Sequence, residues 1–382
     1  MARNPNDITA YRKSNKIKDN LAKMLIIAVV IFVIFFIWTN GEDVFAPLRN
    51  IGSRAESEGF PISLSGSASY EMNHFGTGFL LLSDTYLYTF TDKGGRIFAH
   101  RHNYARPFQK ANDRRILLCN LNGYEFSLFN RSGRLFEVKL DDRIVLIDLG
   151  INDMSAVVTT SAAFSNILYI YDGNGRLRYT RRFIEEEVNA VTFTSKSHEI
   201  IVATSSVRNG EIFSKIYRLR TDTEESVMWE RALPADAWAL NLRENGEYIT
   251  VLADNAIFSL DSENGRVIGS YSFEQGQLVR PVFGTSFNLI VLQDYVTRRP
   301  LFITLDAESN FIKSEIMPFE AKKVEISGEM VYTLTGSIIT IHDSHLVQTG
   351  SVSFEDEYWD FITAGGNALL LGFDTIEQAS LQ

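Results

Sequence analysis

Beyond residue 60 the chain alternates apolar and polar residues over short segments separated by turns rich in Gly, Asn and Asp. Residues 167–183 show this pattern most clearly: Ile-Leu-Tyr-Ile-Tyr leads into Asp-Gly-Asn-Gly, and an alternating stretch follows. β-Branched and aromatic residues favour strands, and glycine supplies the positive φ that a tight connection needs. The pattern predicts a β-hairpin, and helical periodicity is absent from this part of the chain.

The same hairpin pattern recurs along the chain at a spacing of about 42 residues, which is typical of the four-stranded blades of a propeller. Three copies share a Gly-Arg ending followed by Ile or Leu. Because a single unit of this kind cannot bury its own apolar face, we expect the units to stack on one another. The copies span residues 87–101, 124–140, 167–183, 216–233, 256–273, 301–319 and 337–354.

A second pair of strands is expected between consecutive hairpins, and its second member is nearly continuously apolar. Ile-Ile-Val-Ala at 200–203 and Leu-Ile-Val-Leu at 289–292 are examples. Such strands are buried on both faces, as the inner strands of a blade between two neighbours are. The predicted fold class is therefore all-β, a β-propeller of four-stranded blades. The inner pairs are 188–194 with 199–204, 238–242 with 248–253, 279–283 with 289–293, and 324–327 with 330–334.

The number of blades depends on how the two ends of the chain are joined. Residues 359–363 and 368–373 predict one more inner strand pair, but no outer hairpin follows before the chain ends. Residues 61–65 form a short alternating strand before the first complete unit. Pairing this strand with the terminal pair would complete an extra blade and remove open sheet edges. We therefore favour eight blades, and seven blades with an irregular closure are the alternative.

An apolar run from Met24 to Trp38 precedes the repeats, with basic residues before it and the acids Glu42 and Asp43 after it. With Leu21 and Ala22, and with the Lys23 side chain directed toward the headgroups, the run covers 18 positions, near the lower limit of the roughly 17–25 residues that a transmembrane helix needs. A cleaved secretory signal and a buried core helix are the alternatives. Bulky Ile, Val and Phe residues and the lack of a small-residue cleavage pattern favour a single span. The positive-inside bias then places the N-terminus in the cytoplasm and the C-terminal domain outside it.

This order of segments predicts a single-pass protein of the cell membrane with an extracytoplasmic propeller. The expected parts are a cytoplasmic basic tail (1–23), a transmembrane helix (24–39), a juxtamembrane linker (40–59), the β-propeller (60–376) and a C-terminal tail (377–382).

Charge and cysteine content narrow the classes of function. The net charge is -10 and the first 39 residues are basic, so the propeller is more acidic than the whole chain. An acidic surface repels phosphate backbones, and nucleic acid is not an expected partner. Cys119 is the single cysteine, which excludes an internal disulfide and a cysteine-rich metal site. Its apolar neighbours predict an inert core thiol.

Two histidine pairs have spacings that suit metal ligands, but neither pair has a third ligand nearby in the sequence. For His100 and His102 we favour an outward-facing strand edge, and for His342 and His345 a turn.

Several acids also have structural interpretations. The run 185–187 of three glutamates is expected to be a solvated loop between blades, with pKa values that the preceding arginines lower. The acids that open the hairpins, Asp92, Asp172, Asp261 and Asp306, are explained by hydrogen bonding within turns. Hydrolase, phosphate-binding and dinucleotide-binding motifs do not occur. No catalytic, cofactor-binding or metal-binding residue is predicted, and no cofactor is expected.

The Asp/Asn-x-x-Gly-Arg hairpins resemble, in architecture rather than in signature, the WD-repeat-like and quinoprotein-like propeller superfamily over about residues 60–375. Trp359-Asp360 lies on a predicted inner strand and lacks the Gly-His partner of a WD repeat. Together with the apolar run and Gly-Phe-Pro-Ile at 59–62, the layout resembles an uncharacterised bacterial family of single-span, membrane-anchored propeller proteins, a domain of unknown function. This resemblance implies a fold and an anchor, and it brings no active site.

The sequence thus predicts a membrane-tethered, extracytoplasmic propeller that acts as a non-enzymatic binding or scaffold module. Its expected partner is a protein or a cell-wall polymer bound at the rim or the axial face, through residues that the sequence does not identify. The alternative function is an extracytoplasmic hydrolase or sugar-active enzyme whose carboxylates converge at the axis of the ring.

Overall fold

The computed structural model describes residues 59–65, 69–196, 198–223, 226–234 and 236–381. The regular elements in these ranges are all β-strands. Among these residues no helix is found that is long and apolar enough to cross a membrane. The expected basic tail, the expected transmembrane helix and the expected linker up to residue 58 lie outside the described residues.

The described strands form eight antiparallel sheets of four strands each, and the strand order is sequential in seven of them. The predicted all-β propeller with eight blades is therefore confirmed. Blade 1 contains β2 (Tyr70–Phe75), β3 (Gly78–Ser83), β4 (Tyr86–Phe90) and β5 (Arg96–Arg101), and blade 2 contains β6 (Pro107–Ala111), β7 (Ile116–Asn120), β8 (Glu125–Asn130) and β9 (Gly133–Lys139). Blade 3 contains β10 (Ile144–Leu149), β11 (Ser155–Thr159), β12 (Asn166–Tyr171) and β13 (Leu177–Phe183), and blade 4 contains β14 (Glu187–Phe193), β15 (Glu199–Arg208), β16 (Glu211–Arg220) and β17 (Val227–Ala232).

The remaining blades follow in the same order, and the eighth takes its outermost strand from the N-terminal side of the chain. Blade 5 contains β18 (Ala239–Glu244), β19 (Tyr248–Ala253), β20 (Ala256–Asp261) and β21 (Val267–Ser272), and blade 6 contains β22 (Gly276–Phe283), β23 (Phe287–Asp294), β24 (Pro300–Asp306) and β25 (Phe311–Ile316). Blade 7 contains β26 (Lys323–Ser327), β27 (Met330–Leu334), β28 (Ile338–Asp343) and β29 (Gln348–Ser353), and blade 8 contains β30 (Asp360–Ala364), β31 (Asn367–Leu371), β32 (Thr375–Ser380) and β1 (Ile62–Ser63).

The composite blade 8 closes the ring, but the C-terminal side contributes three strands where two were expected. β32 pairs with β31 and with β1, and Ile62 lies opposite Ile376. β32 also runs to Ser380, beyond residue 376 where the expected propeller ends. The sequence around β32 does not show a hairpin, because its partner β1 lies more than 300 residues earlier in the chain.

Burial explains the two kinds of strand in each blade. Ile200, Ile201 and Val202 in the second strand of blade 4 are all fully buried, because neighbouring blades cover both faces. The outermost strand β13 instead alternates exposed and partly buried residues. A continuously apolar pattern therefore marks a strand covered by blades on both faces, and an alternating pattern marks a strand at the rim.

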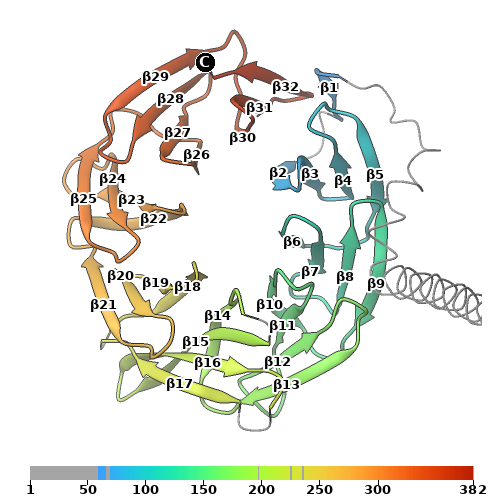
Figure 1. Ribbon diagram of the computed structural model, residues 1–382, viewed down its shortest axis with the longest axis vertical. Helices are drawn as coiled ribbons and strands as arrows, with labels where there is room; N and C mark the ends of the chain where they lie inside the picture. The colour runs from blue at the N-terminus through green and yellow to red at the C-terminus, as the bar shows by residue number, and fades with distance from the viewer. Residues whose placement is uncertain (1–58, 66–68, 197, 224–225, 235, 382) are drawn as a thin grey trace, which may run out of the picture. The chain divides into compact units, whose positions relative to one another are not determined.

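The hydrophobic core of the described residues is divided into eight clusters, one between each two neighbouring blades. At the closure, Phe79 and Phe90 of blade 1 cluster with Leu369 and Ile376 of blade 8. Figure 1 shows the resulting ring, with neighbouring blades side by side around one axis. Each blade depends on both neighbours for burial, so closure contributes to the stability of every blade.

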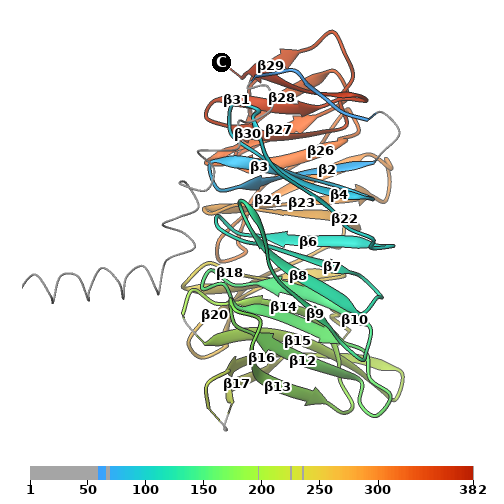
Figure 2. The same ribbon diagram turned by 90° about the vertical axis from the view of Figure 1, so that its right-hand side faces the viewer.

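The ring has two ends, seen from the side in Figure 2. The turns between the first and second strands and between the third and fourth strands lie at one end, here called the hairpin end. The turns between the second and third strands and the loops that lead to the next blade lie at the other, here called the crossover end. Gly59 lies against Gly94 in the β4–β5 turn, so the described chain enters the ring at the hairpin end.

The turns between third and fourth strands carry the signature of the sequence repeat. In blades 1 to 7 each of these hairpins has a register shift just before the turn, which marks a β-bulge. Asp172, Asp261 and Asp306 accept hydrogen bonds from main-chain N–H groups of their turns, as predicted. The prediction for Asp92 is wrong. Thr91, not Asp92, directly follows the last paired residue of β4, and its hydroxyl accepts two such bonds.

Candidate functional site

The innermost strand of each blade pairs with one strand and therefore has a free edge toward the axis of the ring. Figure 1 shows these strands around the axis: β2, β6, β10, β14, β18, β22, β26 and β30. The N–H and C=O groups on such an edge need partners other than a neighbouring strand. Side chains of the adjacent blades supply several of these partners.

Two carboxylates bind groups of the next blade around the ring. Glu325 of β26 accepts hydrogen bonds from the main-chain N–H (3.2 Å) and the Oγ1 hydroxyl (2.6 Å) of Thr363 in β30. Asp360 of β30 accepts a hydrogen bond from the N–H of Met72 in β2 (3.3 Å) and forms an ion pair of 2.8 Å with Lys323. These contacts join blades 7, 8 and 1 beside the axis.

Two more carboxylates make the same kind of contact on the other side of the ring. Asp148 of β10 accepts a hydrogen bond from the N–H of Phe193 in β14 (3.1 Å). Glu244 of β18 accepts one from the N–H of Ser195 (3.1 Å) and one from its hydroxyl (3.2 Å). Blades 3, 4 and 5 are joined in this way, and the acids satisfy donors that would otherwise lack a partner.

A histidine extends the first group of contacts. The Nε2 atom of His74 in β2 lies 3.1 Å from Oε1 of Glu325, and the histidine side chain is 55% exposed. The hydrogen bond with Glu325 raises the pKa of His74, against the opposing effect of burial. Protonated His74 therefore forms an ion pair between blades 1 and 7.

Asp148 has the most perturbed acidity among the axial carboxylates. Burial raises its pKa from 3.8 to about 6, although the charge of Lys110 and hydrogen bonds from the N–H groups of Phe193 and Leu149 oppose this effect. Asp148 is partly buried and keeps only a small exposed surface. Asp148 therefore ionises close to neutral pH.

The axial groups as a whole favour a structural role. Within the described ranges, no group of three or more His, Cys, Asp or Glu side chains is placed to hold a metal ion. Glu325, Asp360, Asp148 and Glu244 each accept a hydrogen bond from the adjacent blade. A carboxyl group that acts as nucleophile or acid catalyst must instead be available to its substrate.

The cysteine and histidines considered in the sequence lie in separate places. Cys119 is buried, and burial raises the pKa of its thiol to about 12, in agreement with a core thiol. His100 stacks on Phe98, with ring centroids 6.1 Å apart. His102 follows the end of β5 and is buried, with Nε2 3.1 Å from the carbonyl oxygen of Ser83, so the prediction of an outward-facing edge is wrong for it.

The second histidine pair is also divided. His345 lies exposed in the β28–β29 turn, as predicted, and its N–H donates to Asp343. His342 lies on β28 rather than in the turn, is 5% exposed, and has a buried Nδ1 atom without a hydrogen-bond partner. The turn begins at Asp343, one residue later than the sequence suggests, because His342 still pairs with Gln348 of β29.

The run of glutamates at 185–187 contains one anchored acid. Glu186 accepts hydrogen bonds from the hydroxyls of Thr204 (2.8 Å) and Tyr217 (2.7 Å), and Lys215 Nζ lies 3.2 Å away. Burial alone would raise the pKa of Glu186, but these partners together lower it. The direction agrees with the prediction, whereas the cation responsible is Lys215 and not the preceding arginines.

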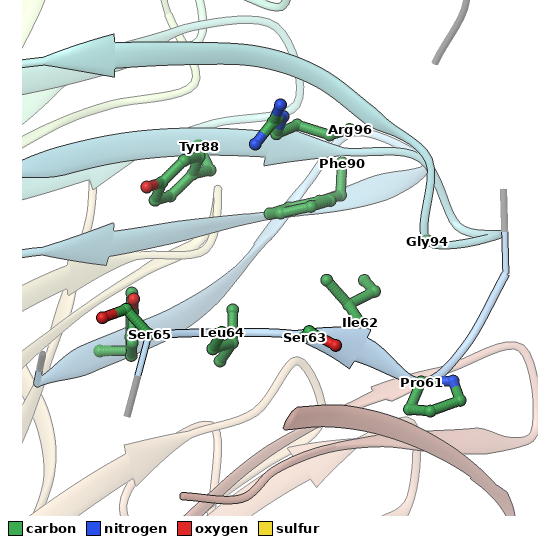
Figure 3. Close-up of a pocket in the computed structure, with 10 residues that line it drawn as sticks. Pro61, Ile62, Ser63, Leu64, Ser65, Tyr88, Phe90, Gly94 and Arg96 are labelled. Atoms are coloured by element: carbon green, nitrogen blue, oxygen red, sulfur yellow. The ribbon is translucent and has the colours of Figure 1, made fainter. Parts of the chain in front are cut away.

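A crevice of ≈ 280 Å³ lies where blade 8 meets blade 1. Figure 3 shows Tyr88, Phe90 and Arg96 of blade 1 on one side and residues 61–65 on the other. The closing strand β1 has 2 residues, whereas β5 in blade 1 has 6. The crevice is thus a consequence of a short outermost strand.

Two other pockets lie at the crossover end. One of ≈ 300 Å³ contains Arg181, whose guanidinium carbon lies 5.4 Å and 5.5 Å from the ring centroids of Phe183 and Tyr217. The other, of ≈ 200 Å³, lies between blades 6 and 7 and contains Arg280 and Arg298. The sequence did not identify these residues, because each pocket joins segments that lie apart in the chain. The available signal was charged residues on predicted strands: Arg181 on an outer hairpin and Arg280 on an inner strand.

Solved structures with less than 25% identity confirm the fold alone. The computationally designed Ika8 protein has 11% identity and a TM-score of 0.62, covering 85% of this chain and 100% of its own. BamB from Moraxella catarrhalis has 9% identity and a TM-score of 0.55, covering 84% and 96%. The C-terminal WD40 domain of Sif2 has 11% identity and a TM-score of 0.58, covering 86% and 100%.

Comparison of the sequence itself gives a narrower result. No curated protein matches the chain. The resemblance to a family without known function is nevertheless supported over blades 1 to 3 and much of blade 4. Residues 55–229 of this chain match the family of unknown function DUF5711.

Proposed function

We propose that this protein is a non-enzymatic binding or scaffold module, tethered to the cell membrane by one N-terminal span and displayed outside the cytoplasm to a protein or a cell-envelope polymer. The hydrogen bonds that the axial carboxylates accept support a non-enzymatic function. Glu325, Asp360, Asp148 and Glu244 are all acceptors for groups of a neighbouring blade. Propellers commonly act as rigid scaffolds for binding surfaces, which supports the same conclusion.

Exposed aromatic residues at the crossover end support this end as the binding face. Trp238, Trp359 and Phe373 are 43%, 39% and 67% exposed, and the rings of the last two lie edge to face with centroids 6.3 Å apart. Aromatic side chains of this kind are enriched at interfaces. The described chain begins at the opposite, hairpin end, where Gly59 lies against Gly94.

The binding face is tested by affinity isolation of the intact chain from membranes. Replacing Trp238, Trp359 and Phe373 together with serine is expected to abolish recovery of the partner. Ile151 is 64% exposed in the β10–β11 turn at the hairpin end, so Ile151→Ser is the matched control and is expected to retain the partner. Equal recovery with both variants would contradict the proposed face.

The tether and its orientation are tested by cysteine labelling in intact cells with a membrane-impermeant maleimide. Ala163 is exposed in the β11–β12 loop, and Ala163→Cys is expected to react without lysis. Ser14→Cys in the basic tail is expected to react only after lysis. The buried Cys119 gives little background. The reverse labelling pattern would show that the proposed orientation is wrong.

The second candidate is a hydrolase or sugar-active enzyme, and Asp148 is the observation that favours it. A carboxyl group with a pKa of about 6 has the acidity of a general acid at neutral pH. Asp148→Asn separates the two functions, because an enzyme would lose about 100-fold or more of its activity while a scaffold would retain its partner. Hydrolysis of cell-wall glycans and partner recovery are the two measurements.

A further inference from the structure

The pocket of ≈ 200 Å³ between blades 6 and 7 has a charged side and an aliphatic side. Its polar lining is Arg280 of β22, Gln293 of β23, Arg298 of the β23–β24 loop and Glu320 of the β25–β26 loop. The aliphatic wall includes Val279, Val291, Leu292 and Pro300. Three strands of blade 6 thus line the pocket together with the β23–β24 and β25–β26 loops.

Arg280 reaches this pocket through an irregularity of the innermost strand. The register between β22 and β23 shifts between Leu278 and Arg280, so Val279 is an extra residue and is 54% exposed. A β-bulge of this kind changes the direction of the side chains that follow it. The Nη1 atom of Arg280 donates to the carbonyl oxygen of Lys322 at 3.3 Å, which fixes the guanidinium against the crossover loop.

Arg298 is held in an uncommon backbone conformation by its loop. Its φ is 59°, in the left-handed region that side chains other than glycine seldom adopt. The Oδ1 atom of Asp294 accepts hydrogen bonds from the N–H groups of Val296 and Thr297 and from the Thr297 hydroxyl, at 3.2, 2.6 and 2.7 Å. The N–H of Arg298 donates to the Asp294 carbonyl oxygen at 3.0 Å. Strain supported by such a network is common at ligand sites.

Both arginines lack a carboxylate partner among the described residues, although the chain carries 47 acidic and 37 basic residues. Glu320 lines the same pocket and forms no ion pair with either of them within the described part of the chain. Arg280 and Arg298 bring two positive charges to one small pocket, and both charges attract an anion bound there. Arginine binds carboxylates through two parallel hydrogen bonds, which favours such a group.

We propose that this pocket binds a carboxylate carried on a short aliphatic group. Arg280 and Arg298 bind the carboxylate, and the aliphatic group lies against Val279, Leu292 and Pro300. Glu320 disfavours a doubly charged phosphate more than a singly charged carboxylate, and the aliphatic wall leaves few further donors. The ligand is the C-terminal residue of a polypeptide or a free aliphatic acid, and this inference gives the proposed binding module one specific ligand site.

The test uses the full chain in detergent and fluorescence anisotropy of a labelled pentapeptide that ends in leucine. The peptide is expected to bind, and its amidated form to bind at least tenfold more weakly. Arg280→Gln is expected to lower the affinity about 10- to 100-fold. Arg298→Asn is expected to do the same, because asparagine tolerates positive φ and preserves the loop. Arg299→Gln replaces an exposed neighbour outside the pocket lining and is the matched control.

Competition identifies the source of the carboxylate. Displacement of the peptide by isovalerate supports a site that accepts free aliphatic acids, and binding of the peptide without such displacement supports a polypeptide C-terminus. Equal binding of the amidated peptide, no binding at all, or an equal effect of Arg299→Gln would overturn the proposal. Such a failure, with partner recovery still dependent on Trp238, Trp359 and Phe373, would leave the binding module in place without this ligand.

Discussion

Gly175 forms part of a turn in blade 3 and lies against an aromatic ring of blade 2. Its φ is 76° in the β12–β13 turn of blade 3, and a Cβ atom added there would lie 2.9 Å from the Phe136 ring of blade 2. The corresponding residues in blades 6 and 7 are Ser309 and Leu346, which adopt φ values of 64° and 60°. The left-handed turn therefore persists where glycine is absent, whereas the close approach of a ring at Gly175 requires glycine.

Gly175→Ala is expected to destabilise the protein by about 1–3 kcal/mol, because it adds both backbone strain and a clash with Phe136. Gly210→Ala is the matched control: Gly210 has φ 84° and no atom within 4 Å of an added Cβ. This control is expected to lose about 1 kcal/mol from strain alone. Chemical denaturation measures both, and equal losses would show that the ring contact contributes nothing.

Asp148 makes stability depend on pH. Its folded pKa is raised by burial from 3.8 to about 6, so its contribution is fully present below pH 3.8 and is lost as the pH rises through 6. Ionisation of this group costs up to about 3 kcal/mol. Asp148→Asn is expected to be more stable than the wild type at pH 8 and equal to it at pH 4. The exposed Asp113→Asn is the control, and a less stable Asp148→Asn at pH 8 would contradict the sign.

At the scale of single elements, a buried ion pair ties one blade to the turn of the next. Arg218 of β16 pairs with Glu199 of β15, and the two side chains are 2% and 5% exposed. The guanidinium also donates to the carbonyl oxygen and the hydroxyl of Ser262 in the β20–β21 turn of blade 5. The pair therefore aligns blade 4 with blade 5 in addition to joining two strands.

Glu199→Gln is expected to destabilise the ring by about 3–5 kcal/mol, because it leaves the Arg218 charge buried and uncompensated. The exposed pair of Lys196 and Glu263, with 55% and 84% exposed side chains, supplies the control. Glu263→Gln is expected to change the unfolding free energy by less than about 0.5 kcal/mol. A small effect of Glu199→Gln would mean that water reaches the pair.

At the scale of the whole molecule, the ring is closed by a strand of 2 residues. Ile62 and Ser63 pair with β32, and the N–H of Leu64 continues the ladder by donating to the Asp374 carbonyl oxygen at 2.6 Å. Phe60 and Ile62 also join the cluster between blades 8 and 1. Closure thus depends mainly on buried apolar side chains and less on the number of paired residues.

A chain that begins at residue 66 is expected to lose closure, with a lower unfolding midpoint and concentration-dependent association, because β32 becomes an open edge. A chain that begins at residue 59 keeps the closing strand and is the matched control. Denaturation and light scattering measure the two effects. Unchanged stability of the shorter chain would show that the core between blades 8 and 1 closes the ring without β1.

Much of the fold could be predicted because its units are local. The outer hairpins need only alternation and turn residues, and these signals lie within about 18 consecutive residues, as at 167–183. The third strand of blade 8 was missed because its neighbour β1 lies at the other end of the chain. The roles of Glu186 and His102 were also missed, because their partners lie on strands that the sequence does not show to be adjacent.

The sequence by itself determined the repeated unit, the buried and exposed strands, and the need for a closing strand, because periodicity and turn chemistry are local properties. The tertiary structure decided which acids bind neighbouring blades, and which arginines share a pocket. Glu325 and Thr363 meet only when the blades are placed around one axis. Arg280 and Arg298 come together within blade 6, and the crossover to blade 7 completes their pocket with Glu320. Contacts between distant residues depend on the curvature and closure of the ring, which no single repeat encodes.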